Sequence, residues 1–156
     1  MEFYCSKNNL VNAVNIVSKA VPSKTTMTIL ECILINVSNG KIILTSNDTE
    51  LGIETEIKGE IKDNGIIAIE AKLFSEIVRK LPDNIVHIKS DNNYVLNISC
   101  EKNNFSIAGK DGSDFPYLED VEKKDFITIS QFTLKEVIRQ TIFSISQSEN
   151  NKIMTG

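Results

Sequence analysis

The stretch IIAIEAKLFSEIVRKL, residues 66–81, predicts one short strand followed by one amphipathic helix. The β-branched residues of Ile66–Ile69 form a run of the length of a buried strand. After this run, apolar residues recur at helical spacing and form one helix face, with Phe74, Ile77, Val78 and Leu81. The opposite face is polar and mainly basic, with Lys72, Glu76, Arg79 and Lys80. Since the residue before a proline is pushed out of the α region, the helix is expected to end before Pro82.

The same strand-and-helix unit recurs at the start of the chain and again near its end. Phe3–Cys5 and Phe126–Ile129 are strand-like, and Ser6 and Ser130 follow them as candidate N-caps. Each is followed by apolar residues at helical spacing, namely Leu10, Val14 and Val17 in the first unit and Leu134, Val137 and Ile138 in the last. The chain therefore uses one local unit three times.

The segments between the helices predict antiparallel strands. Leu51–Ile61, for example, alternates apolar and acidic residues, as a strand with one wet face does. Residues 1–62 and 63–110 each show the order strand, helix and three strands, which indicates an internal structural repeat. Because the strands need their apolar faces covered, we expect an α+β fold in which two helices lie side by side on one face of the sheets.

Length and composition exclude several classes of protein. At 156 residues the chain allows one full domain and part of another. Its 41% apolar and 24% charged composition is typical of a globular protein, and it has no apolar run long enough to span a membrane. The first residues lack the order of a signal peptide, so a cytoplasmic location is predicted.

The residues that most often bind metals are sparse. Cys5, Cys32 and Cys100 are widely spaced without a C-x-x-C pair, which favours buried, reduced thiols. His87 is the single histidine and lies in a predicted strand, which makes it a poor candidate for a metal ligand or a catalytic base. We therefore expect neither a metal nor a cofactor.

The net charge of −4 is unevenly distributed. The three helical units and the loop after the first, residues 7–24, 71–81 and 130–147, hold eight basic and two acidic residues, whereas the remainder holds nine basic and nineteen acidic residues. Exposed helix faces often favour lysine and arginine, which would explain one such helix. Its repetition on every unit favours a shared basic helical surface on an acidic body, as in proteins that bind nucleic acids.

Several local motifs occur in an order that resembles the bacterial sliding clamps, the beta subunits of DNA polymerase III. The motifs are Lys24-Thr25-Thr26 with Ile29-Leu30, Thr45–Glu50 (TSNDTE), Asp114-Phe115-Pro116 and Ile153–Gly156. The resemblance covers the whole chain from its first residue. It implies the DNA clamp fold, a ring of two subunits with three similar domains each, in which helices line the central hole and antiparallel sheets lie outside.

This resemblance implies a function and a domain organisation. Residues 1–118 would form clamp domain one and residues 119–156 the beginning of domain two, so the chain is expected to be an N-terminal fragment. The full protein would be a non-catalytic processivity factor, a homodimeric ring that encircles double-stranded DNA. Its partners would be the replicative DNA polymerase and the clamp loader. Its basic helices would contact phosphates without reading bases.

The resemblance also assigns candidate site residues. The positions that match DNA-contacting positions of the family are Lys24, Lys72, Arg79 and Ser148, and we add Lys80, Lys135 and Arg139 from their place on the helix faces. Thr28 stands where the family often has proline, which we expect to loosen the loop that carries Lys24. Asn151 stands near a common arginine, with Lys152 beside it.

A contact between subunits is implied as well. The strand Asn103–Ala108 would pair with the third domain of the other subunit, with Leu73, Ile77 and Phe105 as apolar contacts. The alternative interpretation is that these three side chains belong to an ordinary core.

The sequence also allows two other classes of function, an enzyme and a protein-interaction module. The chain has no phosphate-binding glycine loop and no nucleophile elbow. The close carboxylate pair that stands out, Asp48 and Glu50, is better explained as a hairpin cap than as an enzyme site. A protein-interaction module without a DNA role is the second alternative. Salt dependence separates it from a DNA-binding protein, because phosphate contacts weaken with added salt.

Overall fold

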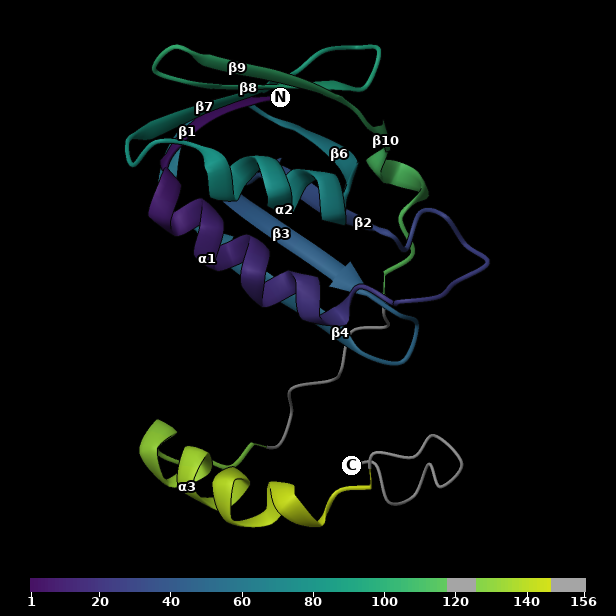
Figure 1. Ribbon diagram of the computed structural model, residues 1–156, viewed down its shortest axis with the longest axis vertical. Helices are drawn as coiled ribbons and strands as arrows, with labels where there is room; N and C mark the ends of the chain where they lie inside the picture. The colour runs from purple at the N-terminus through teal and green to yellow at the C-terminus, as the bar shows by residue number, and fades with distance from the viewer. Residues whose placement is uncertain (118–125, 147–156) are drawn as a thin grey trace. The chain divides into compact units, whose positions relative to one another are not determined.

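The computed structural model of the chain describes residues 1–117 and 126–146. They belong to two compact units, Met1–Glu119 and Asp120–Gly156, referred to below as unit 1 and unit 2. Unit 1 contains two five-stranded sheets and two α-helices, whereas the described part of unit 2 contains one α-helix (Figure 1).

Both halves of unit 1 begin with a strand and a helix and continue with further strands, although four strands follow the helix in the first half and not the predicted three. The first half contains β1 (Glu2–Ser6), α1 (Lys7–Val17), η1 (Ser18–Ala20), β2 (Cys32–Ser38), β3 (Lys41–Asn47), β4 (Gly52–Ile57) and β5 (Gly59–Asp63). The second half contains β6 (Gly65–Glu70), α2 (Ala71–Lys80), β7 (Ile85–Ser90), β8 (Val95–Cys100) and β9 (Asn103–Ala108). The short elements β10 (Lys110–Asp111) and η2 (Gly112–Asp114) end the described part of the unit.

Each of the two sheets contains strands from both halves of the unit. The strand orders are β5-β1-β7-β8-β9 and β10-β6-β2-β3-β4, and every pairing is antiparallel. The first strand of each half pairs with the other half, so that Phe3 of β1 lies opposite Ile88 of β7 and Ile67 of β6 lies opposite Ile35 of β2. Neither half has a complete sheet of its own, and the repeat folds as one body.

The predicted strand Leu51–Ile61 is two strands, β4 and β5, that belong to different sheets. The chain crosses between the sheets at Lys58 and Gly59. A Cβ at Gly59 would collide with the carbonyl oxygen of Tyr4, so this crossing requires a glycine. The sequence pattern hides the break because the alternation of apolar and polar residues continues through it.

One hydrophobic core lies between the two sheets and the two helices. Its largest fully buried side chains include Phe3, Leu10, Ile35, Phe74 and Ile88. A second, smaller cluster lies on the other face of β2 and β6 and consists of Cys32, Leu34, Ala68 and Phe115. All three cysteines are buried as predicted, and burial raises the pKa of the Cys5 thiol to about 12.

The two helices of unit 1 lie side by side, as predicted (Figure 1). Residues of their apolar faces are buried, and Arg79 of α2 contacts Asn15 of α1. Ser18, in the short helix η1 that follows α1, contacts Ser75 of α2. Ser6 caps α1, because its hydroxyl oxygen accepts a hydrogen bond from the Asn9 amide at 3.3 Å. The predicted α+β fold with adjacent helices and antiparallel sheets is thus confirmed.

Unit 2 contains α3 (Gln131–Thr141) and the short turn η3 (Ile142–Ser144). Ser130 caps α3 as predicted, accepting a hydrogen bond from the Thr133 amide at 3.0 Å. The prediction of a strand at Phe126–Ile129 is wrong, because these residues have no regular secondary structure. Within the residues described, no helix is long and apolar enough to cross a membrane.

Candidate nucleic-acid interface

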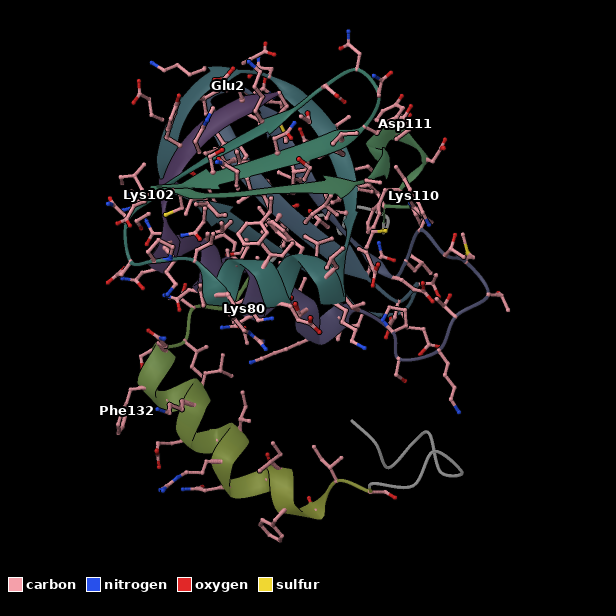
Figure 2. All side chains as sticks on the ribbon, turned by 45° about the horizontal axis from the view of Figure 1, so that its top comes forward. Glu2, Lys80, Lys102, Lys110, Asp111 and Phe132 are labelled. Atoms are coloured by element: carbon pink, nitrogen blue, oxygen red, sulfur yellow. The ribbon has the colours of Figure 1, made fainter. Side chains whose placement is uncertain are left out.

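Helix α2 buries most of its apolar face and exposes its basic residues. Phe74 and Val78 are fully buried, whereas Lys72, Arg79 and Lys80 are exposed. Lys80 projects from the side of α2 that faces away from the sheets (Figure 2). Arg79 and Lys80 lie in the last turn, where the helix dipole favours cations. The fold of α2 itself therefore presents these three cations to solvent.

Helix α1 supports this basic face rather than adding many charges to it. The Arg79 guanidinium donates a hydrogen bond from Nη2 to Asn15 Oδ1 of α1 at 2.8 Å. An amide oxygen carries no net charge, so Asn15 orients the guanidinium without neutralising it. The spacing within either helix could not indicate this pair, because it depends on how the two helices are placed. Lys19 of η1 adds one more exposed cation.

Two separate hollows lie beside the helices of unit 1. One, of about 360 Å³, lies between α1 and β4. The other, of about 200 Å³, lies on the α2 side and is lined by Ser18, Val21, Ala71, Lys72 and Ser75. The polar groups at the α2 side are two hydroxyls and one ammonium. Hydroxyl and ammonium groups serve phosphate oxygens well, and phosphate contacts carry no sequence information.

Lys24 is exposed on the loop of residues 21–31, between η1 and β2. The loop has internal hydrogen bonds, from the Met27 amide to Thr25 Oγ1 and from the Leu30 amide to the Met27 carbonyl, both at 3.0 Å. The sequence predicts that Thr28 loosens this loop, but Lys110 holds Thr28 in place: its Nζ donates to the Thr28 carbonyl and hydroxyl oxygens. No pattern in the sequence indicates this contact, which joins residues 82 positions apart.

The basic residues of unit 2 are arranged differently. Lys135 and Arg139 are exposed on α3, and Arg139 Nη2 lies 2.9 Å from Glu136 Oε2. This ion pair offsets part of the charge of Arg139. Ser148 lies outside the described residues, as do Asn151 and Lys152. Lys24, Lys72, Arg79 and Lys80 thus share unit 1, whereas Lys135 and Arg139 belong to unit 2.

The three residues predicted to contact a second subunit have unequal exposure. Leu73 is 40% exposed, whereas Ile77 and Phe105 are partly buried and pack against the main core. Phe105 lies on β9, which pairs with β8 and forms one edge of its sheet. The burial of Ile77 and Phe105 is compatible with core packing, and their role in a subunit contact stays a prediction.

Asp48, one of the two carboxylates of the hairpin Asn47–Leu51, has a structural role. Asp48 Oδ1 accepts hydrogen bonds from the amides of Leu51 at 2.7 Å and Glu50 at 3.0 Å. These backbone donors hold the pKa of Asp48 below its ordinary value. The interpretation of Asp48 as a hairpin cap is confirmed. In the described ranges, no three His, Cys, Asp or Glu side chains are grouped as they would be to hold a metal ion.

His87 also has a structural environment. Its ring stacks on Tyr4 with centroids 4.4 Å apart, and its Nε2 lies 2.8 Å from Glu2 Oε1. Lys89 lies 3.0 Å from the other carboxylate oxygen of Glu2, and Lys89 and His87 together hold the pKa of Glu2 below its ordinary value. These contacts join neighbouring strands β1 and β7.

Comparison with known proteins gives consistent matches. Residues 1–119 match the family described as DNA polymerase III beta subunit, N-terminal domain. The beta sliding clamp of Bacillus subtilis (strain 168) is 39% identical over 164 aligned residues, and that of Halalkalibacterium halodurans is 35% identical. Each alignment covers 100% of this chain and 43% of the relative. The chain thus spans less than half the length of these curated relatives.

Solved structures match over the same extent. A putative DNA polymerase III beta subunit from Eubacterium rectale superposes with a TM-score of 0.92 at 62% identity, covering 100% of this chain and 43% of that one. The DNA polymerase sliding clamp of Bacillus subtilis superposes with a TM-score of 0.89 at 38% identity, covering 98% of this chain and 42% of that one. The predicted fold class is therefore confirmed by structural similarity as well as by topology.

Proposed function

This chain belongs to the family of DNA polymerase III beta subunits, and from this premise we propose that the protein is a DNA sliding clamp. In this role it is a processivity factor, a ring that encircles duplex DNA and tethers the replicative polymerase. Its function is non-catalytic, because the tether is topological and requires no bond to be made or broken. As a replication protein it acts in the cytoplasm, where the bacterial chromosome lies.

The observation that carries the proposal is the pair of adjacent helices in unit 1. Their buried faces close the core, and α2 turns Lys72, Arg79 and Lys80 to solvent. Exposed, long cations neutralise phosphates without fixing the register of a base, so a duplex can move past them. A base-reading protein would instead need side chains placed in a groove.

The proposal extends to the residues of the site. Lys24 on its loop, Lys72, Arg79 and Lys80 on α2, and Lys135 and Arg139 on α3 contact DNA phosphates, together with Ser148. Long side chains suit this task because a sliding duplex requires contacts that form and break easily. No single contact is indispensable, since each phosphate contact contributes a modest share of the affinity.

The proposal also covers the organisation of the ring. Residues 1–118 form clamp domain one and residues 119–156 begin domain two. The free edge of β9 pairs with a second subunit of a homodimer, with Leu73, Ile77 and Phe105 as apolar contacts. An edge strand of this kind is otherwise a template for aggregation, which a subunit contact prevents.

A loading experiment tests the topological mechanism directly. The protein, extended to the length of its curated relatives, is loaded onto a nicked circular duplex by a clamp loader with ATP, and the bound protein is measured before and after the DNA is linearised. We expect the protein to stay on the circle and to be lost on linearisation. Retention on the linear DNA, or no loading at all, would sink the topological mechanism.

Duplex binding by the 156-residue chain tests the basic face separately. We expect weak binding whose logarithm falls linearly with the logarithm of salt concentration. A triple variant of α2, K72M/R79M/K80M, should lose most of the slope that unit 1 contributes. Binding to a partner protein that does not weaken with salt, with no duplex binding, would favour the protein-interaction module instead.

A further inference from the structure

Lys110 makes an unusual contact for an exposed lysine. Its Nζ donates to the carbonyl oxygen of Thr28 at 3.0 Å and to the hydroxyl oxygen of the same residue at 2.9 Å. Two hydrogen bonds to one residue fix an ammonium group more firmly than a single surface contact does, because they restrict both its distance and its direction. Lys110 therefore forms a clip on the loop of residues 21–31.

The support of this clip is rigid. Lys110 is part of β10 and lies opposite Ala68 of β6. The preceding residue, Gly109, donates from its amide to the Tyr94 carbonyl at 2.7 Å. A Cβ at Gly109 would meet the Ala68 carbonyl oxygen at 2.9 Å, so the backbone is tightly packed at this point. A lysine on such a support can hold a flexible neighbour in place.

The loop itself lacks regular structure between η1 and β2. Its ends are held by buried Ala20 and Leu30, but Lys24 and Thr28 are exposed. Within the described part of the chain, the long-range side-chain hydrogen bonds to residues 21–31 both come from Lys110. Figure 2 labels Lys110 on β10, on the same side of the molecule as this loop.

The clip lies beside a hollow that also has acidic residues in its lining. Glu31 and Glu70 line the same hollow of about 290 Å³ as Thr28 and Lys110. The clip thus places a cation where it supports the loop, while Lys24 remains free to contact a ligand.

We propose that Lys110 is a positioning residue for Lys24: it holds the loop of residues 21–31 in one conformation, so that Lys24 is presented to DNA phosphate. This inference rests on the proposed function, because it names the support of one of its phosphate contacts. Lys110 acts through the loop and does not itself contact DNA.

The first arm of the test measures the loop without DNA. Amide hydrogen exchange at Met27 and Leu30 reports on loop order, because both amides are hydrogen-bonded within the loop. In K110M we expect exchange at these amides to be at least about fivefold faster, since two charge-assisted hydrogen bonds are lost. K110R, which keeps two donors, should restore protection in large part. K102M removes an exposed lysine far from the loop (Figure 2) and should leave exchange unchanged.

The second arm measures duplex binding by the 156-residue chain at low salt, with K24M, K110M and K24M/K110M. If Lys110 positions Lys24, K110M should weaken binding about as much as K24M does, by about two- to fivefold, and the double variant should be no weaker than K24M alone. K110R should bind as the unmodified chain does. K102M controls for the loss of one positive charge.

The possible outcomes separate this inference from the proposed function. Additive losses in the double variant would show that Lys110 contacts DNA itself, which overturns the positioning role. Unchanged exchange in K110M would show that the clip does not hold the loop, which also overturns it. If the unmodified chain shows no salt-dependent duplex binding, the proposed function fails and the positioning role with it, whereas the exchange arm still shows whether the clip exists.

Discussion

Helix α2 of unit 1 and helix α3 of unit 2 have the same kind of sequence but different surroundings. Both are amphipathic, and both carry basic residues on the polar face. In α2 the apolar residues Phe74 and Val78 are fully buried, whereas in α3 Leu134 is 45% and Val137 is 49% exposed. The sheets of unit 1 supply the core against which α2 packs, and the described residues of unit 2 contain no strand.

The difference shows what an amphipathic pattern specifies and what it leaves open. The pattern fixes which face of a helix is apolar, but burial of that face depends on partners elsewhere in the chain. The same holds for the charges. Arg79 of α2 has a neutral partner, Asn15, whereas Arg139 of α3 is paired with Glu136. Two helices with similar patterns therefore differ in stability and in available charge.

The largest effect expected from this comparison is on stability. Replacing Phe74 by Ala should lower the free energy of unfolding of unit 1 by about 3–5 kcal/mol, because it leaves a cavity in the core. Leu134→Ala on α3 should change the free energy of unfolding by about 0.5 kcal/mol or less, since Leu134 is half exposed. Urea denaturation followed by circular dichroism measures both. Equal losses in the two variants would contradict the comparison.

The sequence predicts the local features of this comparison well. The caps at Ser6 and Ser130, the apolar faces of the helices and the side-by-side placement of α1 and α2 are confirmed. These depend on residues three or four positions apart or on the need to cover apolar faces. The exposure of Lys72, Arg79 and Lys80 follows from the same periodicity.

Features that depend on distant parts of the chain could not be predicted. The crossing of the chain between sheets at Gly59 depends on Tyr4, and the clip at Thr28 depends on Lys110. Periodicity within one segment carries no information on such contacts. The orientation of Arg79 by Asn15 belongs to the same class, because the two residues lie on different helices.

The core of unit 1 also predicts a dependence of stability on pH. Burial raises the pKa of Cys5 from its ordinary value of 9.0 to about 12. Between these values the unfolded thiol loses its proton and the folded thiol keeps it, so stability should fall as pH rises above 9. The slope from this group approaches about 1.4 kcal/mol per pH unit.

The free energy of unfolding, measured between pH 8 and pH 10.5, should show this slope. Comparison with a variant that lacks the Cys5 thiol separates its contribution from those of other titrating groups. Cys5→Ala should be less stable at pH 8, because it leaves a small cavity, but its stability should fall less steeply with rising pH. All three cysteines lie in unit 1, so α3 serves as an internal control whose helicity should not follow this titration. A Cys5→Ala variant with the same slope would refute the assignment to this thiol.

The two caps allow a smaller and more local comparison. Ser6→Ala should cost about 1 kcal/mol in the stability of unit 1, because the Asn9 amide loses its acceptor. Ser130→Ala removes the same kind of hydrogen bond from α3. Because α3 has no buried residues, losing this bond should not affect a hydrophobic core. We therefore expect reduced helicity of α3 with no change in the unfolding midpoint of unit 1, as measured by residue-specific amide exchange. A shift of that midpoint in Ser130→Ala would show that the units are coupled.

The smallest expected effect concerns the charge that each helix offers to DNA. Arg79→Met should lower the salt slope of duplex binding by about 0.9, the value for one lost phosphate contact. Arg139→Met should lower it less, because Glu136 already offsets part of the charge of Arg139. The slope is measured by fluorescence anisotropy with a short duplex over a series of salt concentrations.

Two further variants decide whether the partner of each arginine is the cause. Glu136→Gln removes the carboxylate and should make Arg139 more available, so that a second substitution, Arg139→Met, then lowers the slope as much as Arg79→Met does. Asn15→Asp gives Arg79 a charged partner like that of Arg139 and should reduce its contribution to the slope. If neither variant changes the slope, the difference between the helices lies in their position on the DNA and not in their ion pairs.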